Sequence, residues 1–140
     1  MIWKKTVRER KTWTSVFNLN YHFVWCPKYK KPFMIGKYKE FIEKNMYAIA
    51  KEKGVWIAEL KVMPDHIHLF LAAPPQKAPS NIVKCFKGIL GLRLFREFPE
   101  LKKEFWGGRL WSPSYYVGSA GHVSATTIER YIQNQEKEPS

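Results

Sequence analysis

The sequence predicts an α+β protein in which a four-stranded antiparallel sheet carries two helices on one face. Segments in which apolar and polar residues alternate, as in half-buried strands, are interleaved with segments whose apolar residues recur at helical spacing. Their order along the chain is strand, helix, two strands, helix, strand and a last helix. At 140 residues the chain is most economically a single domain, 1–140.

The first three predicted elements precede the central hairpin. The segment from Met1 to Thr12 is basic and aperiodic, so we expect an N-terminal arm (1–12) that orders only against a partner. Val16 to Cys26 has apolar residues at every odd position from 17 to 25, which predicts a strand with one covered face. Lys37 to Lys53 has helical spacing, and Gly54 follows it as a stop signal.

The remaining elements follow the same logic. Val55 to Met63 and His66 to Ala73 are predicted strands, and the Pro64-Asp65 turn between them indicates a hairpin. Ser80-Asn81 can cap a second helix that runs to about Phe98. Ser114 to Ser119 is the fourth strand, and Ser124 caps a last helix (124–136).

This order corresponds to the split β-α-β, or ferredoxin-like, plan that RNA-recognition modules share. Because side chains alternate along a strand, Ile67, Leu69 and Leu71 are expected to face the helices. His66 and His68 then face the open side of the sheet. That side needs a cover, which would be a nucleic acid, a partner chain or the last helix.

The charge of the chain favours a polyanionic partner. Lys and Arg number 24 against 12 Asp and Glu, which gives a net charge of +12 and a pI near 9.8. No apolar stretch approaches the roughly 20 residues of a membrane span, so nucleic acid is favoured over a membrane. Cys26 and Cys85 lack metal-type spacing and no secretory signal precedes them, so we expect a reduced, cytoplasmic protein.

Two pairs of side chains carry the candidate chemistry. His66 and His68 project from one side of a strand and can converge on one cation. Tyr131 and Gln135 share a helical stripe, so Gln135 could offer a third ligand where Tyr131 meets the substrate. Two imidazoles and an amide oxygen leave positions open for water and phosphate, as Mg²⁺ or Mn²⁺ requires. Taken singly, each feature is more often a polar sheet face or ordinary helix packing.

The chemistry that this set suggests is phosphoryl transfer on a nucleic acid. Tyr131 would attack phosphorus and form a 5′-phosphotyrosine, which a later 3′-hydroxyl can reverse while the cation stabilises the leaving oxygen. A phenol has an ordinary pKa near 10, so it must lose its proton during attack. Asp65 or a water of the metal site could accept it, and the sequence does not choose. His22 is a further ligand candidate if its face matches, although a structural hydrogen bond is its more ordinary role.

Four segments in the same order resemble the small single-tyrosine transposases of the HUH superfamily, found in bacterial and archaeal insertion sequences. They are Tyr21 to Lys31 (YHFVWCPKYKK), Met63 to Leu69 (MPDHIHL), Leu110 to Val117 (LWSPSYYV) and Ile128 to Gln135 (IERYIQNQ). The resemblance covers nearly the whole chain. It implies that His66 and His68 are metal ligands, Gln135 the third ligand and Tyr131 the catalytic nucleophile.

The resemblance also implies a homodimer in which the last helix of one chain completes the site of the other in trans. Its substrate would be single-stranded DNA with hairpins at the ends of the element. The candidates for phosphate contacts are Arg8, Arg10, Lys28, Lys30, Lys31 and Arg109. Three alternatives stay open: a domesticated relative that cuts hairpins for its host, a non-catalytic single-strand binder, and a metal-dependent nuclease in which water attacks.

Overall fold

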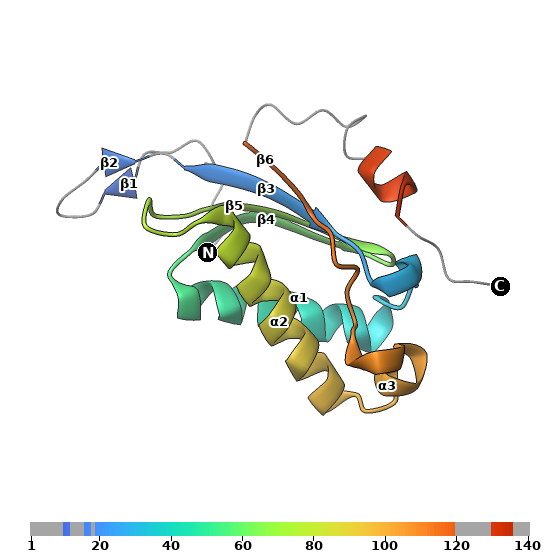
Figure 1. Ribbon diagram of the computed structural model, residues 1–140. Helices are drawn as coiled ribbons and strands as arrows, with labels where there is room; N and C mark the ends of the chain where they lie inside the picture. Colours follow the sequence, from blue (N-terminus) through green and yellow to red (C-terminus); the bar gives the residue numbers. More distant parts are fainter. Residues whose placement is uncertain (1–9, 12–15, 18, 120–129, 136–140) are drawn as a thin grey trace.

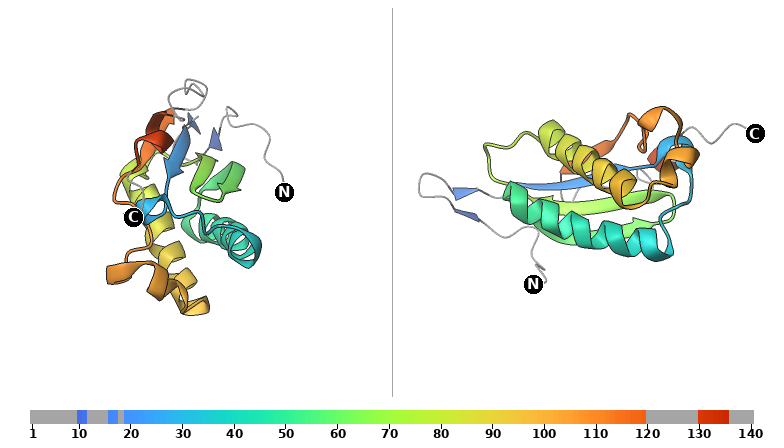
Figure 2. Two further views of the ribbon diagram at one scale, coloured as in Figure 1. Left: turned by 90° about the vertical axis from the view of Figure 1, so that its right-hand side faces the viewer. Right: turned by 90° about the horizontal axis from the view of Figure 1, so that it is seen from below.

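The computed structural model describes residues 10–11, 16–17, 19–119 and 130–135 and contains the expected sheet. Its strands are β3 (Asn20–Trp25), β4 (Trp56–Met63), β5 (His66–Ala72) and β6 (Tyr116–Ser119). They lie in the order β4-β5-β3-β6, and every neighbouring pair is antiparallel. Helices α1 (Gly36–Lys53) and α2 (Pro79–Glu97) cover one face (Figures 1 and 2). The predicted fold class is therefore confirmed.

The predicted first strand is divided in two. Residues Val16–Phe17 form β2, which pairs with β1 (Arg10–Lys11) in a separate two-stranded sheet, whereas β3 begins at Asn20. The prediction of one strand from Val16 to Cys26 is wrong. Residues 10–11 of the expected N-terminal arm pair with β2, and the rest of that arm lies outside the described residues. Asparagine is a poor strand residue, and pairing within a short loop costs little chain entropy. Local pairing therefore competes with extension of the main sheet.

The two main helices end almost where the sequence predicts. Gly54 caps α1 in the left-handed conformation, at φ 70°, which glycine adopts without steric cost. Helix α2 begins slightly before the predicted cap, because Ala78 is its N-cap and Pro79 occupies the first turn. Three short elements follow no clear sequence period: η1 (Lys28–Lys30), α3 (Leu101–Glu104) and η2 (Trp106–Gly108).

A bulge in β4 decides which of its side chains face the core. The register with β5 shifts between Ile57 and Glu59, so Ile57 is buried before the shift and Val62 after it. Without an extra residue, Ile57 and Glu59 would point to the same face. The bulge therefore explains how Glu59 can point outward although its position has the same parity as Ile57.

The core lies between the sheet and the two helices. Ile67, Leu69 and Leu71 of β5 are fully buried, as the alternation predicts. Other fully buried side chains from the two layers are Phe23, Trp25, Ile42, Met46, Ile49, Phe86 and Leu90. On the opposite face of the sheet, His66 and His68 are half-buried. In the described part of the chain, no helix has the length and apolar character that a membrane crossing needs.

Candidate active site

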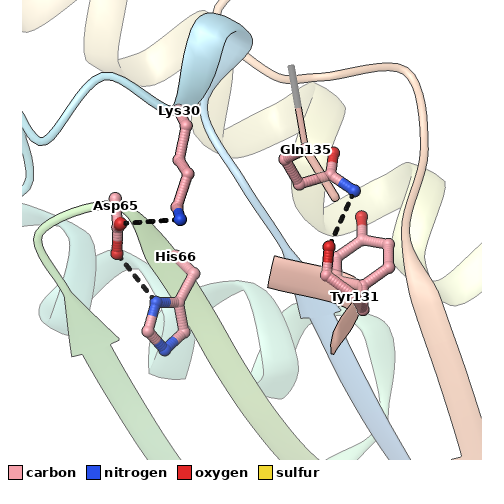
Figure 3. Close-up of polar contacts among 5 residues, drawn as sticks. All are labelled: Lys30, Asp65, His66, Tyr131 and Gln135. Carbon is pink, nitrogen blue, oxygen red and sulfur yellow. Dashed lines mark hydrogen bonds and ion pairs between the residues drawn. The ribbon is translucent and has the colours of Figure 1, made fainter. Parts of the chain in front are cut away.

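His66 is oriented from behind by a carboxylate. Its Nδ1 lies 2.9 Å from Asp65 Oδ1, and Asp65 Oδ2 lies 3.7 Å from Lys30 Nζ (Figure 3). With Nδ1 engaged as the donor in this hydrogen bond, the lone pair of Nε2 is available to a cation. A carboxylate behind a histidine is the usual arrangement around protein metal ligands.

His68 is held neutral on the same face. Burial, followed by the charges of His22, His66 and Lys61, lowers the pKa of His68 to about 4. Its Nε2 is buried and has no hydrogen-bond partner among the described residues. An unpaired buried nitrogen costs roughly 1–3 kcal/mol unless a ligand satisfies it.

The histidine pair therefore fits a divalent cation in its donor chemistry. Both rings can offer a neutral nitrogen, and one of these nitrogens has no other partner. No group of three or more His, Cys, Asp or Glu within the described ranges could hold a metal ion by itself. Any further ligands of the cation would have to be an amide oxygen, water or substrate, which is the ligand preference of Mg²⁺.

Tyr131 and Gln135 occur together on a short helical segment, residues 130–133, and the turn that follows it. The Tyr131 hydroxyl lies 3.0 Å from Ser114 Oγ. Gln135 Oε1 accepts hydrogen bonds from Ser112 Oγ at 3.0 Å and from Ser114 Oγ at 3.2 Å. The Gln135 amide also donates to the Tyr131 carbonyl oxygen at 3.2 Å (Figure 3). We call Ser112 and Ser114 the serine cradle.

In this position the phenol of Tyr131 is a poor nucleophile. Burial raises the pKa of Tyr131 to about 12, although the hydrogen bond between Tyr131 and Ser114 opposes the shift and nearby Cys26 adds to it. The Tyr131 ring also contacts that of Tyr116, with centroids 6.3 Å apart. The hydroxyl is therefore protonated at neutral pH.

The two pairs lie on opposite sides of β3. In the view of Figure 3 this strand runs between His66 and the Tyr131–Gln135 pair. Val24 of β3 pairs with His68 of β5 on one side and with Tyr116 of β6 on the other. The backbones at His68 and Tyr116 are therefore two strand spacings apart, about 10 Å. Among the described residues, no hydrogen bond joins Tyr131 or Gln135 to either candidate ligand. The two pairs are therefore separate within the single chain. We call His66 with His68 one candidate half-site, and Tyr131 with Gln135 the other.

Helix α2 supports the serine cradle. Lys87 Nζ donates to the carbonyl oxygens of Ser112 at 2.8 Å and Ser114 at 3.2 Å, and burial lowers the Lys87 pKa. The Trp111 indole nitrogen donates to the Lys87 carbonyl oxygen at 2.9 Å. No role for Ser112 or Ser114 was predicted from the sequence. The signal that could have indicated one is that these two hydroxyl residues flank a proline within the segment Leu110 to Val117.

Lys30 is a basic candidate that is linked to His66 through Asp65. Tyr29 and Lys30 both have left-handed backbones, with φ of 60° and 55°. Such conformations cost non-glycine residues on the order of 1–2 kcal/mol, and this kind of strain often occurs at functional sites.

The other basic candidates are more dispersed. Lys28 lies over the Tyr29 ring, and Lys31 pairs with Glu104 at 3.3 Å. Arg109 is exposed and borders a groove next to α2. Arg10 belongs to β1, but its side chain, like all of Arg8, lies outside what the structure describes.

The family model described as transposase IS200 like matches residues 15–135, a range that includes both half-sites. The chain belongs to the IS200-like transposase family. This IS200-like transposase is 38% identical over 120 residues to the ISDra2 transposase TnpA of Deinococcus radiodurans, with 86% of each chain covered. It is 31% identical over 122 residues to the IS200 transposase of Salmonella typhimurium, covering 87% of this chain and 80% of that one.

Solved structures support the same assignment. A crystal structure of a candidate transposase from Deinococcus radiodurans R1 matches this transposase with a TM-score of 0.86 and 36% identity, covering 92% of this chain and 99% of that one. A REP-associated tyrosine transposase, solved bound to a REP hairpin, matches with a TM-score of 0.55 and 10% identity over 89% of this chain and 68% of that one. The second likeness is one of fold alone.

Proposed function

We propose that this transposase cleaves and rejoins single-stranded DNA at the ends of its insertion sequence through a covalent 5′-phosphotyrosine on Tyr131. The observation that carries the proposal is the histidine pair on the open sheet face. His66 has a carboxylate behind it, and His68 has a buried nitrogen without a partner among the described residues. A pair of imidazoles with an available nitrogen is suited to holding a cation that activates a phosphodiester.

His66, His68 and Gln135 would hold this cation, Mg²⁺ or Mn²⁺. Bound there, it would act as a Lewis acid toward the scissile phosphate. Gln135 Oε1 already accepts hydrogen bonds from both hydroxyls of the serine cradle. It therefore has to leave the cradle before it can coordinate metal. Release of Gln135 from the serine cradle is thus a required step of the proposed cycle.

Tyr131 performs the covalent step. Its Oη forms a bond to phosphorus as the bond from phosphorus to the 3′-oxygen breaks, leaving a free 3′-hydroxyl and a 5′-phosphotyrosine. The phenol proton leaves during this exchange, and the 3′-oxygen gains one. Attack by another 3′-hydroxyl reverses the step and joins a new strand. Asp65 is engaged with His66 and Lys30, which argues against it as the proton acceptor.

We further propose that the active form is a homodimer in which the last helix of one chain completes the site of its partner. The separation of the two half-sites across β3 supports this arrangement. A second copy can bring Tyr131 to the histidines without passing it over the strand. Isologous contact between two copies would make two such sites.

The proposed substrate carries hairpins at the element ends. The net charge of +12 favours phosphate contacts, for which Arg8, Arg10, Lys28, Lys30, Lys31 and Arg109 are the candidates. A fold relative was solved with a REP hairpin, which makes such a DNA structure a reasonable first probe. The candidates would position the DNA more than read its sequence.

The test uses single-stranded DNA spanning an element end, labelled at either terminus, with Mg²⁺ or Mn²⁺ and a denaturing gel. We expect a metal-dependent covalent adduct on the new 5′ end at the cut, so that the adduct carries the 3′-terminal label, and we expect it to be absent from Tyr131→Phe. Cleavage without an adduct would instead indicate a nuclease that uses water. Binding without cleavage of a verified end would indicate a non-catalytic binder. A domesticated relative would give the same adduct and is distinguished by its genomic context.

A further inference from the structure

His22 is an imidazole on the open face that the proposed mechanism does not use. It comes from β3, and its ring stacks on that of His68 with centroids 4.1 Å apart and planes 30° apart. Phe70 meets the His22 ring edge-on, with a centroid distance of 5.2 Å and an angle of 60°. The rings of His68, His22 and Phe70 are thus in contact across β3 and β5, and the first two of them are stacked.

The register of the sheet produces this stack. His22 pairs directly with Phe70, and Val24 pairs with His68, so His22 and His68 are diagonal neighbours on adjacent strands. Diagonal neighbours on one face lie within reach of aromatic side chains. On its other side His22 pairs with Gly118 of β6, which has no side chain to compete for the ring.

The stacking geometry argues against His22 as a third metal ligand. An imidazole coordinates through a lone pair that lies in the plane of its ring, so ligands of one cation aim their ring planes at a common point. Two rings stacked nearly face to face direct their lone pairs side by side instead. The described residues also contain no group of three or more His, Cys, Asp or Glu able to hold a metal ion.

We propose that His22 is a positioning residue for His68. Its ring restricts rotation of the His68 imidazole about the bond to Cβ and so keeps the buried Nε2 in the orientation that receives the cation. A ligand that is already oriented loses less conformational freedom on binding. The inference rests on the metal site of the proposed function, but it concerns a residue outside the proposed ligand set.

The experiment compares His22→Phe, which keeps a flat ring without nitrogens, with His22→Ala, which removes the ring. Mn²⁺ alone is titrated into each metal-free, full-length protein and followed by electron paramagnetic resonance. We expect His22→Ala to weaken Mn²⁺ binding about tenfold or more, and His22→Phe to remain within about threefold of wild type. Thermal unfolding of each variant checks that the fold is retained.

A second readout needs no metal. The stacked ring should shift the proton resonances of the His68 imidazole, and this shift should persist in His22→Phe and disappear in His22→Ala. Equal loss of Mn²⁺ binding in both variants would overturn the proposal by showing that a His22 nitrogen is required. Unchanged binding in both would also overturn it and leave the proposed metal site intact. Wild type that binds no Mn²⁺ would instead refute the metal site itself.

Discussion

Burial shifts the pKa values of individual side chains in the two candidate half-sites. His68 and Tyr131 are both held in their neutral forms, the first by a lowered pKa and the second by a raised one. Neutral imidazole is the form that can bind a cation, whereas neutral phenol is the unreactive form of the nucleophile. His68 is therefore in the form that its proposed role needs, whereas Tyr131 would have to lose its proton before or during attack.

His68 should couple stability to pH in the metal-free protein. Burial, followed by the charges of His22, His66 and Lys61, lowers its pKa from 6.5 to about 4. Below pH 6.5 the unfolded chain takes up a proton that the folded chain refuses, so the free energy of unfolding falls from pH 6.5 to about 4. The loss should be well below the roughly 3 kcal/mol of the full shift, because the ring is partly exposed.

Urea unfolding at pH 7.5, 5.5 and 4.5 measures this loss. His68→Gln lacks the titrating ring, so its stability should change less over the same interval. An identical pH dependence in wild type and His68→Gln would show that other groups control the acid side of the curve.

Cys26 should be unreactive although it lies close to the candidate site. Its side chain is fully buried, and burial, with a smaller contribution from Asp65, raises its thiol pKa to about 12. Only the thiolate reacts with disulfide reagents, so Cys26 should resist modification at pH 8. Cys85 is partly exposed and should react.

A thiol titration counts the reactive groups. Native protein should expose one thiol and denatured protein two, matching the two cysteines of the chain. Native Cys85→Ser should show no fast phase. Rapid reaction of this variant would mean that Cys26 is accessible through opening of the fold.

Contacts between elements position the serine cradle. Gly91 of α2 is buried against Trp111, and a Cβ added there would lie 3.3 Å from the indole nitrogen. That nitrogen is already fixed by its hydrogen bond to the Lys87 carbonyl. The absence of a side chain at Gly91 therefore lets Trp111, in the segment that precedes β6, pack close to α2.

Two alanine substitutions in α2 should differ for this reason. Gly88→Ala meets nothing within 4 Å and should stabilise the protein by about 0.5–1 kcal/mol through helix propensity. Gly91→Ala gains the same propensity but pushes on Trp111, so its net effect should be smaller or destabilising. Chemical denaturation of both variants measures the difference. Equal stabilisation would show that Trp111 moves aside freely.

At the element level, periodicity was informative where one face of a segment is buried. It identified β5 and both main helices, because a buried face imposes a regular pattern on the residues. It failed at Val16 to Cys26, where an unbroken alternation spans two strands of different sheets. Alternation marks an extended backbone but not the partner of a strand. The bulge after Ile57 is likewise a property of the pairing.

For the whole molecule, the proposed trans arrangement can be tested by complementation. Tyr131→Phe lacks the proposed nucleophile and His68→Ala lacks a proposed metal ligand, so each protein alone should form no DNA adduct. If sites are completed in trans, half of the randomly mixed dimers contain one intact site of two, which restores about a quarter of wild-type adduct. Co-refolding or co-expression followed by the adduct assay measures this.

Completion in cis predicts a different result from the same mixture. Every chain then carries its own defect, and mixing restores nothing above the two variants measured separately. The control for subunit exchange is purification through an affinity tag on one variant, followed by detection of the untagged second variant in the eluate.

The sequence by itself determined which residue types are available for the proposed chemistry and the face of β5 from which the histidines project. It could do so because side-chain alternation and helical spacing follow from local backbone geometry. Only the tertiary structure decided that His22 stacks on His68, that the serine cradle holds Tyr131 and Gln135, and that β3 separates the two half-sites. These contacts join residues far apart in the chain, so they depend on strand order, register and packing, which no local pattern encodes.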